Sequence, residues 1–340
     1  MKYFSTTART LVLVILNIAI FIFIGKWLYE NIRPTVLLAH IRELSPLTTL
    51  EVVAINILVV AVYGKRMASL LRRDFLTSWY IVNLGFGLNS VLPFRLGEPA
   101  KIYHAYRYFD LSPVQLATAT FIEKFLDLSI VAVLLAFTIA FSAQRILDPA
   151  LLCWTTAVLA AASIVILTFN KGFTALEKLV TGTGKLSALV QNVREFSHSY
   201  PLLPVLAATV MIWGLNLAVV YFAFNAFLPA TTVGFIDAVT LMLICVLSVA
   251  IPAAPAGLGL FEAGIVAYLT QFLRVPQEQA LAAAIVFHIA VILPQLAIML
   301  AVIARYSHKK RGHNDLLAET KWGTAPGSRR PSPGDDDHVR

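Results

Sequence analysis

The sequence predicts an all-α protein that crosses a membrane many times, and three observations lead to this class. The chain of 340 residues is 58% hydrophobic and only 14% charged, whereas a soluble domain carries about 25% charged residues. Its mean hydropathy is +0.76. Its apolar residues gather in runs of about 20, the length of a helix that crosses the hydrocarbon core. The bilayer is therefore the expected solvent for most side chains.

Seven apolar runs are long enough to be predicted spans, namely residues 10–28, 47–63, 113–142, 149–169, 202–228, 235–256 and 280–304. Three further segments are apolar but interrupted: 76–92, 93–112 and 258–273. Residues 171–198 place apolar side chains at helical spacing between lysines, which predicts an amphipathic helix on the membrane surface. We expect about eight full spans together with re-entrant or broken helical segments.

The positive charges predict the orientation of the chain. The net charge is +8, but Lys and Arg cluster in short loops, where they favour anionic lipid headgroups over nucleic acid. Four basic regions are placed in the cytoplasm: the N-terminus, loop 64–75, segment 171–198 and the tail. Both termini are then cytoplasmic, in a bacterial inner membrane. Residues 306–340 are rich in Gly, Pro, Ser and charge and are expected to form a disordered tail after the membrane domain of residues 1–305.

Two interrupted stretches resemble each other. The first contains Pro93, Gly97 and Glu98 and is followed by a helix opening at Pro113. The second contains the same types of residue, Pro255, Gly257, Gly259 and Glu262, before Pro276. With five elements in each of the stretches 5–142 and 149–305, the halves enter the membrane from opposite faces, as in the inverted repeats of transporters. The two turns are then predicted tips of re-entrant hairpins; chance similarity is the alternative, because Pro and Gly are common in membrane helices.

The strongest group of charges inside a predicted span is Glu123, Lys124 and Asp127. The two carboxylates are four residues apart on one helix face and repel each other, so a cation must lie between them or one must be protonated. Arg95, Lys101 and Arg107 are the available cations. The group is either a structural ion-pair network or a site for a lipid headgroup or a proton.

Other polar residues allow two interpretations each. Arg95 follows a Pro in a Gly-containing turn and its guanidinium suits phosphate, or it pairs with Glu98 or Glu123. Glu262 binds a cation or an amine headgroup, or serves as a helix N-terminal acid. His288 makes a polar contact inside a span or relays protons.

Several amides line a path or bond between helices, namely Asn83, Asn89, Asn216, Asn225 and Gln295. Cys153 and Cys245 are expected to be packing residues. The Gly257–Gly259 pair lacks the strand–helix context of a nucleotide loop. No metal ligands, catalytic residues or cofactor are predicted.

The motifs together resemble a known family of bacterial membrane proteins. Three motifs carry the resemblance: Asn89-Ser90-Val91-Leu92-Pro93 leading into Arg95-Leu96-Gly97-Glu98, then Glu123-Lys124-Phe125-Leu126-Asp127, and finally Pro255-Ala256-Gly257-Leu258-Gly259-Leu260-Phe261-Glu262. They are similar to motifs of the lysylphosphatidylglycerol synthase transmembrane, or flippase-like, family. The resemblance covers roughly residues 5–305. The family typically has Glu-Arg where this chain has Glu123-Lys124.

The resemblance implies movement of a lipid between leaflets. Synthase members carry an aminoacyltransferase domain and some archaeal relatives a glycosyltransferase domain; neither is expected here, so the chain is predicted to be a membrane module and not an enzyme. Some stand-alone relatives are associated with hopanoid lipid biosynthesis, which extends the expectation to a hopanoid-type cargo. The residues expected to hold the headgroup are Arg95, Glu98, Glu123, Lys124, Asp127 and Glu262, supported by Asn89, Pro93, Gly97, Lys101, Pro255, Gly257, Gly259 and His288.

Two other functions stay open at this point. One is a membrane-embedded lipid-modifying enzyme with Glu123 or Asp127 as general base. The other is an accessory subunit of a lipid or envelope biosynthesis complex, in which these charges would hold only the fold. Membrane lipids are the expected partners of the protein, with anionic headgroups at its basic cytoplasmic loops, and lipid-biosynthesis enzymes are further candidates.

Overall fold

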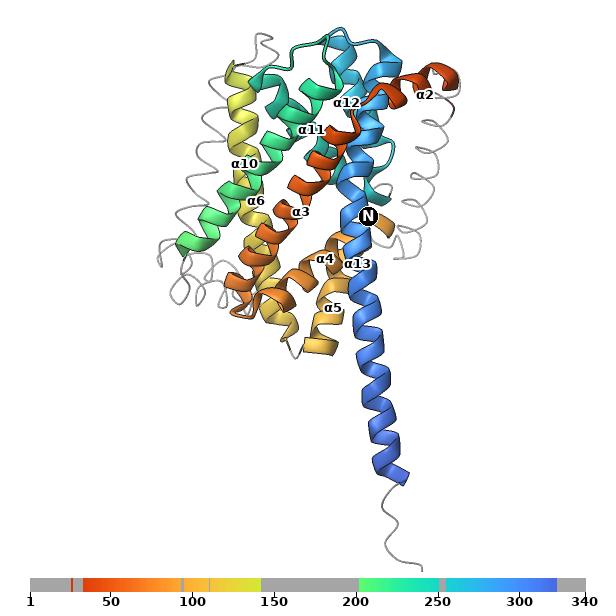
Figure 1. Ribbon diagram of the computed structural model, residues 1–340. Coiled ribbons are helices and arrows are strands. Elements are labelled where there is room, and N and C mark those ends of the chain that lie inside the picture. The colour runs from red at the N-terminus through yellow and green to blue at the C-terminus, as the bar shows by residue number, and fades with distance from the viewer. Residues whose placement is uncertain are drawn as a thin grey trace, which may run out of the picture. The chain divides into compact units, whose positions relative to one another are not determined.

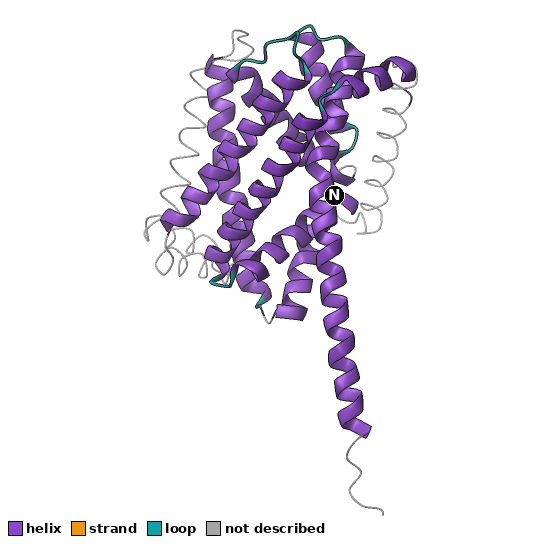
Figure 2. Cartoon of the chain, viewed as in Figure 1, coloured by secondary structure: helices purple, strands orange, loops and turns teal. Residues whose placement is uncertain are grey.

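The computed structural model of the protein describes residue 26 and residues 33–92, 95–109, 111–141, 202–250 and 255–322. In these residues the chain forms helices joined by loops and turns, without strands (Figure 2). The predicted all-α fold is confirmed for this part of the chain. The chain divides into two compact units, Met1–Met299 and Leu300–Arg340, and the hairpins and the candidate site lie in the first.

The described helices carry the labels of Figure 1 and are α2 (Pro34–Glu43), α3 (Pro46–Leu71), α4 (Phe75–Val91), α5 (Gly97–Phe109), α6 (Pro113–Phe141), α10 (Leu202–Phe227), α11 (Phe235–Ala250), α12 (Leu260–Gln271) and α13 (Gln277–Trp322), with a short 3₁₀ turn η2 (Pro255–Gly257) before α12. By length and composition, four of them could cross a membrane: α3, α6, α10 and the part of α13 up to Ala304. The protein is therefore an α-helical membrane protein, while the total number of crossings stays a prediction.

Four of the predicted spans coincide with these long helices. The predicted span 235–256 is wrong at its C-terminal end, because α11 stops at Ala250 and η2 follows from Pro255. Proline lacks the N–H that would continue the helix. The predicted interrupted segments are the shorter helices α4, α5 and α12. The predicted spans 10–28 and 149–169 and the amphipathic segment 171–198 lie outside the described residues.

Helix α3 is longer than its apolar run. Ser45 caps its start by accepting the Thr48 N–H at 3.3 Å, with Pro46 in the first turn, and Arg72 ends it in the left-handed region at φ 51°. Asp74 then caps α4 by accepting the Thr77 N–H at 2.9 Å, and this bond holds the pKa of its carboxyl below the usual value. The predicted basic loop 64–75 is wrong over most of its length, since only residues 72–74 connect α3 to α4. Counting Lys and Arg does not separate solvated cations from those that are paired inside a helix bundle.

Two helical hairpins in this unit each have a broken turn at the tip. The first joins α4 to α5 and the second joins α11 to α12 through η2, which packs against both α11 and α4. In Figure 1 α5 lies toward the lower end of the bundle and α12 toward the upper end. Because η2 packs against α4, the tip of the second hairpin contacts a helix of the first. Their relation by an inverted repeat stays a prediction.

The first hairpin closes tightly because Gly97 has no side chain. Its N–H donates to Asn89 Oδ1 at 2.8 Å. A Cβ added at Gly97 would lie 2.5 Å from both Asn89 Oδ1 and the Gly85 carbonyl oxygen. The glycine thus lets the start of α5 rest directly on α4.

An aromatic cluster packs the second hairpin against α10 and α13. The ring of Phe287 lies 5.2 Å from that of Phe224 and 6.3 Å from that of Phe261. All three side chains are buried. This packing fixes the register of α13 and so the position of His288, one residue further along.

The second unit, in its described part, consists of the C-terminal portion of α13, which continues to Trp322. The tail predicted to be disordered, residues 306–340, begins within this helix, and its disorder stays a prediction. Leu, Ala, Glu, Lys and Arg predominate between residues 309 and 321, and these are strong helix formers. Gly323 and Pro326 follow directly, and the remainder of the predicted tail, residues 323–340, lies outside the described residues.

We predict that Gly97→Ala lowers the thermal unfolding temperature of the detergent-solubilised protein. The added methyl group must displace Asn89 or the α4 backbone, an overpacking that costs about 1–3 kcal/mol. Gly214→Ala is the matched control, because a Cβ there meets nothing within 4 Å, and alanine favours a helix. Equal unfolding temperatures for the two variants would contradict the close contact between α4 and α5.

Candidate functional site: a charged network beside a cavity

The charges of the bundle are organised by Arg66, which extends from α3 toward α6. Its side chain is fully buried and its two terminal nitrogens donate to the two carboxylate oxygens of Asp127, at 2.7 and 3.0 Å. Arg66 Nη2 also lies 3.5 Å from Glu123 Oε1. A guanidinium can satisfy two acids at once because its donors form a planar fork. Arg66 is thus the cation that the two acids of α6 require.

Helix α10 completes the surroundings of this pair. The Thr209 hydroxyl accepts a hydrogen bond from Arg66 Nη1 at 3.1 Å, and Trp213 Nε1 donates to Asp127 Oδ1 at 3.2 Å. The guanidinium lies 4.9 Å from the centre of the Tyr63 ring, which adds a cation–π contact. Three helices, α3, α6 and α10, are therefore tied together at one buried salt bridge.

The network continues from α6 to the first hairpin. Lys124 Nζ lies 3.1 Å from Glu123 Oε1 and 3.3 Å from Glu98 Oε1. Lys101 Nζ lies 2.7 Å from the other oxygen of Glu98. Three cations face three carboxylates, so the network is neutral as a whole. A neutral network is what a low-dielectric interior tolerates, because an unpaired charge there is costly.

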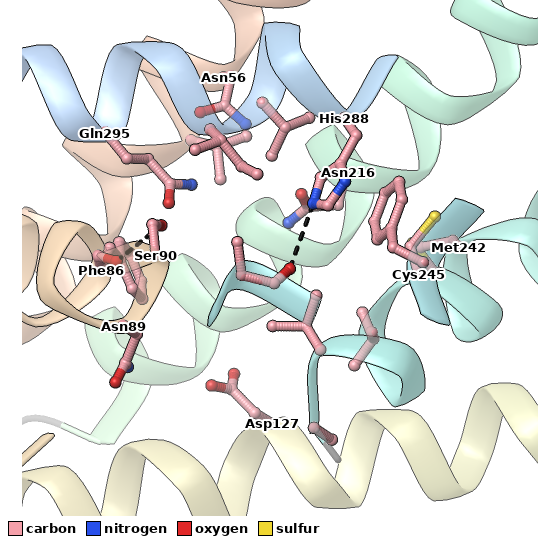
Figure 3. Close-up of a pocket in the computed structure, with 18 of the residues that line it drawn as sticks. Asn56, Phe86, Asn89, Ser90, Asp127, Asn216, Met242, Cys245, His288 and Gln295 are labelled. Atoms are coloured by element: carbon pink, nitrogen blue, oxygen red, sulfur yellow. Dashed lines mark hydrogen bonds between the residues drawn. The ribbon is translucent and has the colours of Figure 1, made fainter. Parts of the chain in front are cut away.

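A cavity of about 410 Å³ lies next to this network (Figure 3). It is lined by residues of α3, α4, α6, α10, α11, α12 and α13, and so by both hairpins. Its charged lining residues include Arg95, Lys124 and Asp127, whereas Glu123 and Arg66 are buried behind them. The Lys124 side chain is 39% exposed. The network therefore has a dry side at Arg66 and a side that faces the cavity.

Arg95 occupies the turn between α4 and α5 with φ 55°. It lines the cavity, and no ion-pair partner is found for it in the part of the chain that the structure describes. Its predicted partners are engaged elsewhere, Glu98 by Lys101 and Lys124 and Glu123 by Arg66 and Lys124. The expectation that Arg95 pairs with either acid is wrong, because closer cations satisfy both. Its donors are left available at the cavity.

The second turn is built around Glu262 and His288. One carboxylate oxygen of Glu262 accepts the Gly259 N–H at 2.7 Å, and the other lies 2.5 Å from His288 Nδ1. His288 Nε2 lies 3.2 Å from the Ala256 carbonyl oxygen, a contact drawn in Figure 3. Glu262 therefore fulfils its predicted structural role at the start of α12, and His288 makes its predicted polar contact inside a helix.

Backbone geometry makes this second turn unusual. Ala256, Gly257 and Gly259 all have positive φ, at 55°, 74° and 86°. Such conformations are strained for alanine and natural for glycine. Pro255 starts the 3₁₀ turn. The side chains of Glu262 and His288 hold this strained backbone through Gly259 and Ala256.

Four amides add neutral hydrogen-bonding groups to the cavity, and Figure 3 shows them around it. They are Asn56, Asn89, Asn216 and Gln295. Asn89 Oδ1 is used by Gly97 and Asn216 Nδ2 by the Ile212 carbonyl. Asn56 is only 4% exposed, and its Oδ1 has no hydrogen-bond partner among the described residues. The amides thus offer unused donors and acceptors to a polar occupant.

The structure brings most of the predicted site residues together. Glu98, Lys101, Glu123, Lys124 and Asp127 form one network, and Arg95, Asn89 and His288 share the cavity with it. Gly97, Pro255, Gly257, Gly259 and Glu262 shape the two turns. Pro93 lies outside the described residues. Arg107 is exposed on α5 and takes no part.

Sequence reasoning missed Arg66, Thr209, Trp213 and Asn56. Arg66 was predicted to lie in a basic loop beside Lys65, Arg72 and Arg73. Helical spacing was the signal that could have identified it, because position 66 follows the buried positions 52, 56 and 59 on one face of α3. Nothing in the sequence distinguishes Thr209 or Trp213 from other residues of an apolar span.

The fold and the cavity define an α-helical membrane protein with a charged site among its helices. A family model, described as the lysylphosphatidylglycerol synthase TM region, matches residues 14–298. The chain belongs to this family, which confirms the resemblance found in the sequence and agrees with a membrane role related to lipids. A comparison with curated proteins gave no match.

We predict that Arg66→Met destabilises the protein by about 3–5 kcal/mol, because it removes the cation between Asp127 and the buried Glu123. Thermal unfolding in detergent measures the effect. The double variant Arg66→Met/Asp127→Asn should recover part of the loss, since no bare charge is left. Arg107→Met, on the exposed face of α5, is the control and should unfold like the wild type. An Arg66→Met protein as stable as this control would show that the salt bridge does not hold the bundle.

Proposed function

We propose that the protein moves a lipid between the two leaflets of a membrane, with the headgroup passing through the cavity while the acyl chains stay in the lipid. Dragging a charged headgroup through hydrocarbon costs at least several kcal/mol. A polar cavity lowers this cost because its side chains replace the water of hydration. The family membership supports a lipid-related membrane role, and the cavity supports the more specific proposal of flipping.

The single observation that carries the proposal is the guanidinium of Arg95, which lines the cavity and has no ion-pair partner among the described residues. The neighbouring network is neutral, so Arg95 gives the cavity lining an excess positive charge. Five N–H donors on a planar group match the oxygens of a phosphate. An anionic, phosphate-bearing headgroup is therefore the cargo class that the site favours. An amine headgroup is disfavoured because Glu262, its predicted partner, is engaged by His288 and Gly259.

The two hairpins suggest how the cavity could open to either side. Each brings a Pro- and Gly-containing turn to the same cavity, and irregular backbone in a membrane is tolerated where it lines such a space. In transporters with inverted repeats, rocking of one half against the other gives alternating access. We assign the α4–α5 and α11–α12 hairpins to these two halves.

Location and partners follow the same proposal. We assign the protein to a bacterial inner membrane with both termini in the cytoplasm, on the distribution of its Lys and Arg residues. Anionic headgroups would gather at its basic cytoplasmic segments. A hopanoid-type cargo and contact with lipid-biosynthesis enzymes rest on the family resemblance alone.

The competing proposal of a lipid-modifying enzyme has less support. It needs Glu123 or Asp127 as a general base, but Asp127 is held by two hydrogen bonds from Arg66 and Glu123 lies between Arg66 and Lys124. The oxygens that a general base would use to take a proton from a substrate therefore already face cationic donors. Mass analysis of the lipid separates the proposals, since a flippase relocates a lipid without changing its mass.

We predict that Arg95→Gln slows the relocation of labelled phosphatidylglycerol in proteoliposomes by about 10–100-fold, the equivalent of losing a charged hydrogen bond of about 1.5–3 kcal/mol. Arg95→Lys should retain part of the activity, because it keeps the charge but not the fork. Thermal stability should stay unchanged, since Arg95 has no ion-pair partner among the described residues.

Arg274→Gln is the matched control for this experiment. Arg274 also has positive φ, at 57°, and lies in an exposed turn between α12 and α13. It should relocate lipid at the wild-type rate. Equal losses in Arg95→Gln and Arg274→Gln, or a loss in neither, would contradict a headgroup site at Arg95.

A further inference from the structure

The contacts of His288 place a proton-binding pair beside the cavity. On one side, His288 Nδ1 and Glu262 Oε1 are 2.5 Å apart, and two lone pairs cannot face each other at this distance, so a proton lies between them. On the other side, His288 Nε2 lies 3.2 Å from the Ala256 carbonyl oxygen, which can only accept. A neutral imidazole has one N–H and satisfies the first contact alone, whereas hydrogen bonds at both contacts require one further proton on Nε2.

This pair is enclosed by packing, and its histidine adjoins the cavity. His288 is 3% exposed and lines the cavity, and its ring stacks on Phe261 with centroids 3.9 Å apart. The titratable and charged groups that share the lining come from α3, α6, the first turn and α11, and they are Tyr63, Lys124, Asp127, Arg95 and Cys245. Lys124 and Asp127 are fixed in the neutral network. Among the described residues at this cavity, the contact of His288 with Glu262 is therefore where two groups share a proton.

We infer that Glu262 and His288 form a proton-binding site whose occupancy is coupled to the headgroup in the cavity. This inference rests on the proposed function and adds the proton as the ion that regulates it. Proton binding from water changes the charge of the pair from −1 to 0, and release returns the proton to water. An anionic headgroup is repelled by the first state and not by the second, so proton and headgroup favour each other's binding.

The second turn gives the proton a mechanical effect as well. With the proton in place, His288 holds Ala256 and Glu262 holds Gly259, the two ends of a backbone with three positive φ angles. Without it, the single N–H of the neutral imidazole stays on Nδ1 toward Glu262, and the lone pair on Nε2 faces the Ala256 carbonyl oxygen, so the hydrogen bond to Ala256 is lost. The strained turn is then released from one of its two supports. Proton loss therefore favours both an open turn and an empty cavity.

We predict that phosphatidylglycerol binds the purified full-length protein less tightly as the pH rises, by up to about tenfold per pH unit over the range in which the pair releases its proton. The phosphodiester keeps its charge over this range, so the change belongs to the protein. Glu262→Gln should bind independently of pH at the tight, low-pH level of the wild type. Its amide can donate to His288 Nδ1 and accept the Gly259 N–H, which mimics the protonated pair.

Two further variants make the test specific. Glu278→Gln, at the start of α13 where it pairs with Arg33, should keep the wild-type pH dependence. His288→Gln should lose it, which provides a second check should Glu262→Gln fold poorly. A wild type insensitive to pH, or a pH dependence that survives in both Glu262→Gln and His288→Gln, would overturn the proton site.

Lipid relocation measured in parallel distinguishes this inference from the proposed function. Relocation that occurs equally at every pH refutes the coupling and leaves transport in place. Relocation that is absent at every pH, with folded protein, refutes the transport on which the coupling depends. Relocation whose pH dependence disappears in Glu262→Gln supports both.

Discussion

One buried ion pair, Arg66 with Asp127, sets the arrangement of the rest of the structure. Its guanidinium is fully enclosed and joins α3 to α6, while Thr209 and Trp213 bring in α10. In a membrane protein such a charge is tolerated only when its partners are fixed around it, since hydrocarbon offers no water to replace them. The pair therefore fixes three helices relative to one another, and the cavity forms where their polar side chains meet both hairpins.

Charge balance then separates structural from functional residues. The other cations of the network, Lys101 and Lys124, are matched by Glu98 and Glu123, so removing any member leaves a bare charge and disturbs the fold. Arg95 differs because its guanidinium has no such partner among the described residues and faces the cavity. The same reasoning applies at the second turn, where Glu262 and His288 are together neutral only with the proposed further proton bound. A structural network, the proposed headgroup site and the proposed proton-binding pair thus border one cavity without sharing residues.

Much of this was predictable from the sequence, for identifiable reasons. Long apolar runs predicted α3, α6, α10 and α13, and the Pro- and Gly-containing turns with their glutamates predicted which segments border the site. The partner of Asp127 was not predictable from charge counting, because Arg66 lies beside the basic residues Lys65, Arg72 and Arg73 and resembles a loop cation. Only three-dimensional packing shows that α3 continues through it. Likewise, a lone histidine in an apolar helix gives no sign of its partner, and the Glu262 contact depends on α12 folding back onto α13.

Passage of a headgroup by this route requires a water-filled cavity that both hairpins line, and the accessibility of thiols in the cavity tests this requirement directly. In a protein with Cys153→Ser and Cys245→Ala, single cysteines are introduced by Ser90→Cys in the first hairpin, by Val249→Cys in the second, and by Phe222→Cys on the exposed face of α10. A charged thiol reagent should modify the cysteines at 90 and 249, because only a hydrated thiol ionises and reacts, and added phosphatidylglycerol should slow both reactions. The cysteine at 222 should stay unmodified in the lipid. If the cysteines at 90 and 249 react no faster than the one at 222, the cavity is dry and the proposed passage for the headgroup does not exist.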